Sequence, residues 1–303
     1  MKQKSLFLIV AACSMTCLVG FSANAASQSA AGSGAAHPEL VVSTQWLSDH
    51  ISDRNLVIVH IGHDEQDYRA GHIPGARYLP MDKFATGQTA PGTELLPADE
   101  LKRNLEAIGI GDDSRVVYYA PDWDPMATRL FFTMDYLGHG NQAALLDGGL
   151  DQWTLEKRPT STEASDAKPA NLTVHLHPEI VARMDDMTKL VVNSGKDVTI
   201  IDARPSKRYR NGHLRGAQSL YWENALVSEK EPLLKTPEQL RQLFDEAGIR
   251  GKKKAITYCE VGLQASYVYF LARYLGIDSA MYDGSYREWS EAKQPVIRGD
   301  SPQ

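Results

Sequence analysis

Positive charge and long apolar runs are both scarce in this chain of 303 residues, and each shortage excludes a class of protein. The formal net charge is −6 at pH 7, whereas a nucleic-acid-binding surface concentrates lysine and arginine. Hydrophobic residues make up 43% of the chain and charged residues 23%. These are the proportions of a soluble globular protein, and they exclude a disordered chain and a membrane-embedded bundle. The length favours two domains over one compact core.

The N-terminus differs from the rest of the chain. An apolar run, Leu6 to Phe21, follows Lys2 and Lys4 and precedes Ala23-Asn24-Ala25. This order of basic, apolar and small residues is typical of a cleavable secretory signal peptide. We therefore expect residues 1–25 to be removed and the mature protein to be exported, to the periplasm, with no membrane span left after cleavage.

Cysteine is scarce too: the chain has three cysteines, and two of them lie in the predicted signal peptide. Cys13 and Cys17 lie within residues 1–25, so cleavage leaves only Cys259 and excludes an intramolecular disulfide. An alternative is that Val10-Ala11-Ala12-Cys13 acts as a lipoprotein box and leaves Cys13 acylated. A lone thiol in an oxidising compartment is either buried and inert or reactive, and its neighbours must distinguish these cases.

The chain contains two copies of one unit, about 140 residues apart, and such self-similarity indicates a repeated structural unit. The copies share their order and spacing, as three pairs of segments show: Tyr68 to Ala76 with Tyr209 to Ala217, Tyr136-Leu137-Gly138 with Tyr274-Leu275-Gly276, and Asp147-Gly148 and Trp153 with Asp283-Gly284 and Trp289. Features present in both copies are expected to be architecture, and features present in one copy are candidates for function. His72 and His213, and also Arg69 and Arg210, are shared and are therefore interpreted as structural.

Each copy alternates short β-branched runs with longer segments of helical period. Leu56 to Ile61 and Val198 to Ile201 are expected strands, and Pro237 to Ala247 and Ala265 to Leu275 are expected helices. This alternation predicts an α/β protein of two tandem domains, each a mainly parallel sheet flanked by helices. The expected boundaries are 38–157 for the first domain, 158–174 for a Pro-, Ser- and Thr-rich linker, and 175–300 for the second domain.

One difference between the copies concerns chemistry. Ala120 stands in the first copy where Cys259 stands in the second, so only the second copy can perform thiol chemistry. The loop after Ala120 contains two prolines and two acidic residues, which suit neither backbone hydrogen bonding to an anion nor its charge. The first domain is therefore predicted to be catalytically inactive and the second to be catalytic.

The residues around Cys259 predict a strand, a six-residue loop from Cys259 to Gln264, and a helix that begins at Ala265. In this arrangement backbone N–H groups and the positive end of the helix can face the sulfur, and both favour thiolate over thiol. Gly262 allows the loop to curl without a side-chain clash. The alternative is a cysteine that merely ends a buried strand.

The sequence Cys-x-x-Gly-x-x-Ala-Ser at Cys259 to Ser266 resembles the active loop of rhodanese-like sulfurtransferases. Ile201-Asp202-Ala203-Arg204 and the segment from Tyr209 to Ala217 are similar to other blocks of that family, and the two-copy layout is similar to its tandem members. The resemblance implies two rhodanese-like domains and a persulfide on Cys259, with no metal or organic cofactor. It also implies thiosulfate or 3-mercaptopyruvate as the sulfur donor and a thiol or cyanide as the acceptor.

The resemblance also assigns the site residues. Arg208 matches an arginine that binds the anionic donor, and its counterpart in the first copy is Asp67, a charge reversal expected if only the second site attracts an anion. Alternatively, Arg208 is a surface charge. Asp202 and Arg204, opposite Ile61 and His63, are candidate supporting residues, expected to form a structural pair beneath the loop. The substrate-binding loop is expected to comprise Glu260, Val261, Gly262, Leu263 and Gln264.

The loop matches neither the cationic loops of the thiosulfate enzymes nor the small-residue loops of the mercaptopyruvate enzymes, so the donor stays open. Glu260 is expected to point to solvent, because a carboxylate facing the sulfur opposes both thiolate formation and anion binding.

Two other functions use a cysteine in a similar setting, namely dephosphorylation and persulfide carriage. A phosphatase needs His-Cys-x5-Arg, but here Tyr258 precedes the cysteine and Ala265 takes the place of the arginine, which argues against it. An exported persulfide carrier or binding module that delivers sulfur to a protein partner needs the same nucleophile and loop as an enzyme. It therefore stays an alternative.

Overall fold

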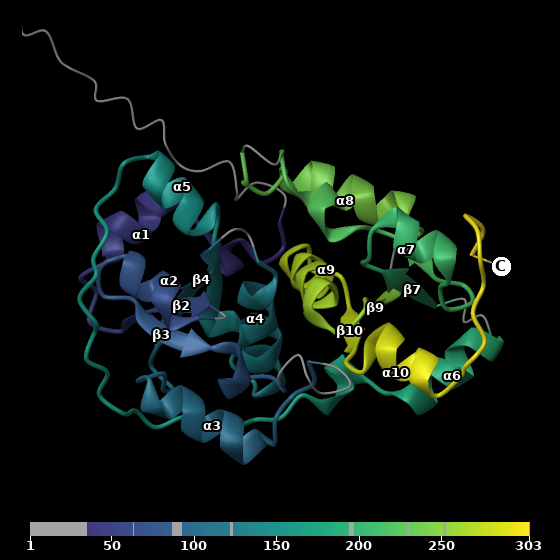
Figure 1. Ribbon diagram of the computed structural model, residues 1–303, viewed down its shortest axis with the longest axis horizontal. Coiled ribbons are helices and arrows are strands. Elements are labelled where there is room, and N and C mark those ends of the chain that lie inside the picture. Colours follow the sequence, from purple (N-terminus) through teal and green to yellow (C-terminus); the bar gives the residue numbers. More distant parts are fainter. Residues whose placement is uncertain are drawn as a thin grey trace, which may run out of the picture.

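The computed structural model describes residues 35–62, 64–86, 93–121, 124–193, 197–228, 231–250 and 253–302. The predicted signal peptide, with Cys13 and Cys17, lies outside these ranges. Within them, the chain forms two five-stranded sheets, each flanked by helices and placed side by side (Figure 1). The predicted fold class is confirmed.

The first sheet has the strand order β1-β5-β4-β2-β3, and each neighbouring pair is parallel. Its strands are β1 (Val41–Val42), β2 (Leu56–Gly62), β3 (Arg77–Pro80), β4 (Arg115–Tyr119) and β5 (Ala143–Leu146). The helices of this domain are α1 (Thr44–His50), α2 (Glu65–Ala70), α3 (Ala98–Ala107), α4 (Met126–Tyr136) and α5 (Gly149–Leu155). Because parallel strands need crossover connections, each helix follows a strand and covers a face of the sheet.

The second sheet repeats this order as β6-β10-β9-β7-β8, again with parallel pairs. Its strands are β6 (Val181–Ala182), β7 (Val198–Asp202), β8 (Gln218–Ser219), β9 (Lys254–Tyr258) and β10 (Ser279–Tyr282). Its helices are α6 (Met184–Asn193), α7 (Ser206–Asn211), α8 (Pro237–Glu246), α9 (Leu263–Tyr274) and α10 (Ser285–Glu291). The identical topology is the structural counterpart of the sequence duplication. The expected strands and helices match the observed ones within two residues.

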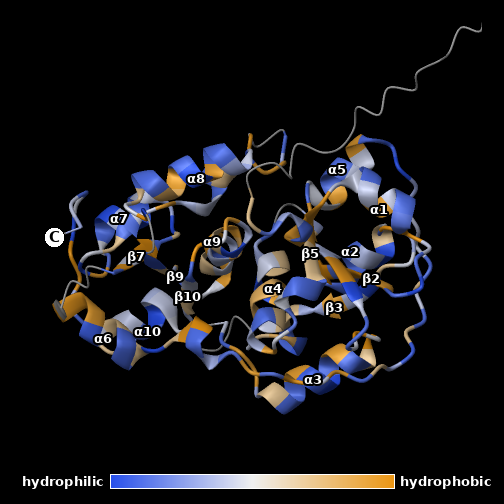
Figure 2. Cartoon of the chain, turned by 180° about the vertical axis from the view of Figure 1, so that it is seen from behind, coloured by the Kyte–Doolittle hydropathy of each residue, from blue (hydrophilic) through white to orange (hydrophobic). Residues whose placement is uncertain are grey.

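Burial follows from the position of each element. The central strands β4 and β9 each begin with a basic residue and are buried after it, as expected for strands covered by helices on both faces. The outer helix α8 instead shows hydrophilic and hydrophobic residues in alternation (Figure 2), with Leu240 and Phe244 buried on one side. Within the described ranges, no helix is both long and apolar enough to cross a membrane.

Strand register corrects one pairing between the copies. His60 pairs with Tyr119 across β2 and β4, just as Asp202 pairs with Tyr258 across β7 and β9. The counterpart of Asp202 is therefore His60 and not Ile61, which the sequence comparison had placed there. The first copy has one residue more from His60 to Tyr68 than the second has from Asp202 to Tyr209, and this insertion shifted the sequence comparison.

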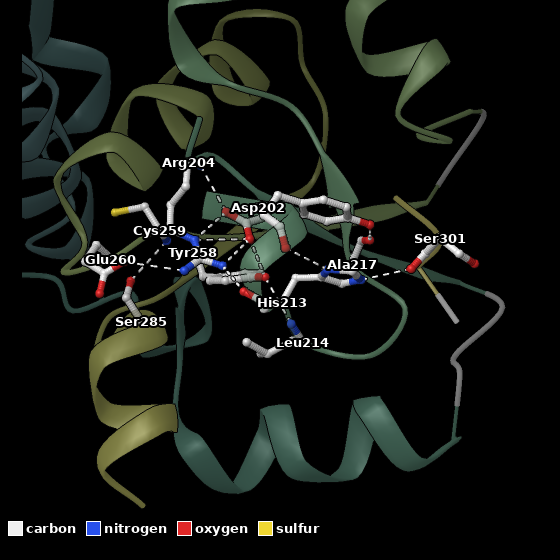
Figure 3. A network of polar contacts seen from close by, with 12 residues as sticks. Asp202, Arg204, His213, Leu214, Ala217, Tyr258, Cys259, Glu260, Ser285 and Ser301 are labelled. Atoms are coloured by element: carbon white, nitrogen blue, oxygen red, sulfur yellow. Dashed lines mark hydrogen bonds and ion pairs between the residues drawn. The ribbon is translucent and has the colours of Figure 1, made fainter. Parts of the chain in front are cut away.

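The shared histidines have matching environments in the two domains. The ring nitrogens of His72 lie 2.7 and 3.0 Å from the carbonyl oxygens of Tyr68 and Glu163. Both nitrogens of His213 lie 3.0 Å from the carbonyl oxygens of Tyr209 and Ser301, as Figure 3 shows for Ser301. Each histidine is buried and ties the chain that leaves its domain back onto the domain, which is a structural role.

The two domains meet where α4 packs against α9. Phe131 and Phe270 meet edge to face with ring centroids 5.0 Å apart. Asp135 accepts hydrogen bonds from Tyr269 Oη at 2.6 Å and from Arg273 Nε at 2.8 Å. A single apolar cluster extends through both helices, so the interface is built like a domain core.

Candidate active site

Cys259 directly follows β9, at the carboxyl edge of the second sheet, where open α/β sheets place their ligands. Its side chain is buried, with 1% of its surface exposed. Helix α9 begins at Leu263, so the loop comprises four residues, Cys259 to Gly262, and not the six expected. Gly262 has φ +100°, a conformation that L-residues avoid, and it turns the chain straight into the helix. Leu263 and Gln264 consequently lie, half-buried, in the first helical turn.

The carbonyl groups of the loop point away from the sulfur. Cys259 O accepts from Tyr286 N at 2.9 Å, Glu260 O accepts from Arg287 N at 3.0 Å, and Val261 O accepts from Thr93 N at 2.8 Å. In a planar trans peptide the N–H points opposite to the C=O, so the N–H groups of Val261 and Gly262 face inward, and together with that of Ala265 they act on the sulfur. Gly262 N donates to Cys259 Sγ at 3.1 Å. The loop is therefore a cradle of N–H donors around the sulfur.

The closed cradle does not make the resting thiol acidic. Burial raises the pKa of Cys259 above its usual value, and the N–H groups of Ala265, Val261 and Gly262 oppose this only in part. The charge of Asp202 adds to the rise. The expectation that the loop favours thiolate over thiol is therefore wrong for this structure, because desolvation of the charged form outweighs the donors.

Asp202 and Arg204 form a buried ion pair under the loop (Figure 3). Arg204 Nη2 lies 2.7 Å from Asp202 Oδ2, and Nε lies 2.9 Å from Oδ1. Asp202 also accepts from Tyr258 Oη at 2.6 Å, and the Arg204 guanidinium stacks 3.9 Å from the ring centre of Tyr286. Burial by itself lowers the pKa of Arg204, but the hydrogen bonds and charge of Asp202 raise it overall. The guanidinium is therefore a permanent charge beside the loop.

Glu260 is partly in solvent and partly engaged. Its side chain is 40% exposed, and Oε2 lies 3.4 Å from Arg204 Nη1. The expected solvent orientation thus holds for only part of the side chain, because the Arg204 cation attracts it. Val261 is half-buried.

Arg208 lies on α7 and is exposed, while its neighbour Tyr209 is buried. Its position matches that of Asp67 on α2, so the charge reversal between the copies is a structural fact. Among the described residues, Arg208 makes no hydrogen bond or ion pair with the loop, whereas Arg204 pairs with Glu260. A donor-binding role for Arg208 stays a prediction.

The first domain contributes groups that the sequence comparison missed. Arg129 of α4 is fully buried, and its Nη1 lies 2.6 Å from Asp283 Oδ1. Leu95 N donates to Asp283 Oδ2 at 2.9 Å, and Thr93 holds the Val261 carbonyl. The available signal was Arg129 itself, the one basic residue of a mostly apolar helix. Nothing in the sequence placed these residues opposite the loop.

At the equivalent place in the first domain, Ala120 follows β4 and is buried. A methyl group offers no nucleophile. Two residues of the loop after Ala120, Asp122 and Trp123, lie outside the described residues. Across the described ranges, no cluster of three or more His, Cys, Asp or Glu side chains is placed to hold a metal ion.

Comparisons with known proteins agree with this geometry. A family model described as "Rhodanese-like domain" matches residues 43–156 and 185–292. The chain is 29% identical to the sulfur carrier protein TtuD of Thermus thermophilus, covering 88% of this chain and 99% of that protein. It is 27% identical to a thiosulfate sulfurtransferase of Corynebacterium glutamicum, covering 88% and 93%.

Solved structures show the same fold. SseA from Escherichia coli, described with the 3-mercaptopyruvate sulfotransferases, superposes with a TM-score of 0.72 at 24% identity, covering 82% of this chain and 98% of that chain. A complex of EanB with ergothioneine gives a TM-score of 0.78 at 21% identity, covering 87% and 71%. The chain belongs to the rhodanese-like family, and within it to the two-domain sulfurtransferases.

Proposed function

We propose that Cys259 takes the outer sulfur of a small anionic donor, stores it as a persulfide, and passes it to a thiol or to cyanide. The observation that carries this proposal is the cradle, in which Gly262 N donates to Sγ at 3.1 Å and the loop carbonyls are tied outward. Such a cradle suits a sulfur that gains negative charge, because oriented N–H donors stabilise the anion without reorganising. The second domain is the catalytic one, and the first carries no nucleophile at Ala120.

The reaction proceeds in two half-reactions. The Cys259 thiolate attacks the outer sulfur of thiosulfate, the S–S bond of the donor breaks, and sulfite leaves with the bonding electron pair. With 3-mercaptopyruvate the C–S bond breaks instead, and the carbon takes up a proton as pyruvate forms. The acceptor then attacks the terminal persulfide sulfur and releases the Cys259 thiolate. A nucleophile that is modified and regenerated in this way gives ping-pong kinetics.

The donor class is an anion of the thiosulfate or 3-mercaptopyruvate type. The C. glutamicum relative is named for the first donor and the SseA structure for the second. The loop residues Glu260 to Gln264 include no cation, so an arginine from outside must bind the anionic end of the donor. We assign this role to Arg208, with Asp202 and Arg204 supporting the loop from below.

A second candidate function is delivery of the persulfide to a protein partner without rapid small-molecule turnover. Two observations favour it: the Cys259 side chain is 1% exposed, which protects a stored sulfur from solvent reductants, and the T. thermophilus relative is named a sulfur carrier.

Turnover separates the two functions. Steady-state rates are measured with thiosulfate or 3-mercaptopyruvate, and with cyanide or a thiol as acceptor. Intact mass after addition of the donor alone is expected to show one added sulfur atom, which the acceptor removes. The control is Cys259→Ser, which cannot hold a sulfane sulfur and is expected to be inactive. A persulfide that forms without turnover indicates the carrier, and transfer by the serine variant contradicts the assignment of the nucleophile.

We also infer that the protein works after export, because residues 1–25 have the order of a signal peptide. N-terminal sequencing of the exported protein is expected to begin near Ala26. A mature chain that begins at an acylated Cys13 would instead support the lipoprotein alternative.

A further inference from the structure

Thr93 of the first domain makes two hydrogen bonds to the active loop of the second. Its backbone N donates to Val261 O at 2.8 Å, and its Oγ1 donates to the same oxygen. Thr93 is fully buried. The two bonds occupy both lone pairs of the Val261 carbonyl, so the orientation of this carbonyl is set from the first domain.

The Val261 carbonyl belongs to the peptide that serves the sulfur. The N–H of that peptide is Gly262 N–H, which donates to Cys259 Sγ at 3.1 Å. Since C=O and N–H of one trans peptide point in opposite directions, a carbonyl held by Thr93 keeps this N–H aimed at the sulfur. A peptide free to rotate about its neighbouring dihedral angles would lose this aim.

The duplication provides an internal comparison. Leu95 N donates to Asp283 Oδ2 at 2.9 Å, and Leu234 N donates to Asp147 Oδ1 at 2.9 Å, so these two bonds are equivalent across the domain interface. Two residues before Leu234 stands Pro232, opposite Thr93. Proline has neither a backbone N–H nor a hydroxyl. The second domain therefore cannot return this contact to the loop after Ala120, and the asymmetry favours the loop that carries the cysteine.

We propose that Thr93 is a positioning residue for Cys259, and that the first domain tunes the reactivity of the sulfur through the Val261–Gly262 peptide. The role of Thr93 in sulfur transfer rests on the function proposed for Cys259. The nucleophile and its donors belong to the second domain, but the aim of one donor depends on the first. A domain without its own thiol thus completes the site.

The test measures alkylation of Cys259 by iodoacetamide as a function of pH, followed by mass spectrometry of the Cys259 peptide. In this reaction the thiolate sulfur displaces iodide, so the pH midpoint reports how well the site stabilises the thiolate, and the plateau rate reports access. Thr93→Val removes the hydroxyl at nearly constant shape. Because a misdirected Gly262 N–H stabilises the thiolate less, the midpoint is expected to rise by about 0.5 to 1 pH unit.

Two further variants serve as controls. Thr93→Ser keeps the hydroxyl, so its midpoint is expected to stay near that of the unaltered protein. Thr133→Val removes another buried hydroxyl of the first domain, one that donates to Phe84 O at 3.1 Å, and it is expected to leave the midpoint unchanged. All three variants preserve the charged groups on the elements around the loop, which are Asp202, Arg204, Glu260, Asp283, Arg287, Glu94 and Arg129.

The outcomes decide between the explanations. A midpoint that stays unchanged in Thr93→Val overturns the proposal, and so does an equal shift in Thr133→Val, which would indicate a general loss of stability. Thermal unfolding of each variant checks that the protein is folded at the temperature of the assay. Alkylation needs no sulfur donor, so an unaltered protein that transfers no sulfur would contradict the proposed function while the midpoints still test Thr93.

Discussion

Mild acid is expected to destabilise this protein through His60, which lies at the end of β2 in the first domain. His60 is fully buried, its Nδ1 lies 3.2 Å from Tyr119 Oη, and its Nε2 has no hydrogen-bond partner within the described residues. Burial, with a smaller effect from the charge of His72, lowers its pKa from 6.5 to about 4. The fold therefore holds this imidazole neutral.

The sign and size of the effect follow from linkage. The folded pKa lies below the unfolded one, so the unfolded chain binds the proton more readily in the interval between them. Stability is fully present above the unfolded pKa, near 6.5, and is lost as the pH falls towards 4. A displacement of about 2.5 units corresponds to about 3 kcal/mol, most of which is lost by about pH 4.5.

Urea denaturation at pH 7.5 and pH 4.5 measures this loss, with His60→Asn as the comparison. Asparagine retains a polar atom for Tyr119 but does not titrate. The variant is expected to be less stable at pH 7.5, because it leaves unfilled volume, yet its stability is expected to fall by about 2 to 3 kcal/mol less between the two pH values. An equal fall in both proteins would refute the reasoning and place the acid sensitivity elsewhere.

Two further substitutions test the site and the interface. Arg208→Ala is expected to weaken use of the donor by about ten- to a hundredfold, which is the value of one charge-assisted contact, and Arg208→Lys is expected to fall between this variant and the unaltered protein. Initial rates over a range of donor concentrations measure the effect, and an equal effect of the neighbouring Arg210→Ala would contradict the assignment. Asp135→Ala removes the hydrogen-bond acceptor of Tyr269 and Arg273. It is expected to lower the free energy of unfolding by about 2 to 4 kcal/mol, since Arg273 stays partly solvated. A loss below about 1 kcal/mol by urea denaturation would show that the ion pair contributes little.

The fold and the nucleophile could be predicted because their signals are local. Strand and helix periods lie within a few residues, and the contrast between Ala120 and Cys259 needs only an alignment of the two copies. The loop length was wrong because the left-handed conformation of Gly262 starts the helix two residues early. The residue of the first copy placed opposite Asp202 was wrong because a one-residue insertion hides the equivalence of Asp202 and His60.

The rest depends on contacts that the sequence does not show. Thr93 and Val261 are 168 residues apart, and Arg129 and Asp283 are 154 residues apart, so no local pattern relates them. The rise in the pKa of Cys259 also depends on the burial of its side chain, which follows from how the two domains pack around it. Where a site lies between two domains, the sequence motif of the catalytic domain reveals its chemistry, but no motif reveals how the other domain affects the site.

The ion pair between Asp135 and Arg273 has a consequence for assembly. The two residues precede the equivalent Tyr136 and Tyr274, so they occupy the same position in the two copies and meet near the axis that relates them. Two identical domains joined about such an axis would bring two carboxylates or two guanidinium groups together, which repel. Opposite charges at this position therefore favour pairing of unlike domains and disfavour pairing of like ones. The Asp135–Arg273 pair therefore favours packing of the first domain against the second, and every chain contains both domains.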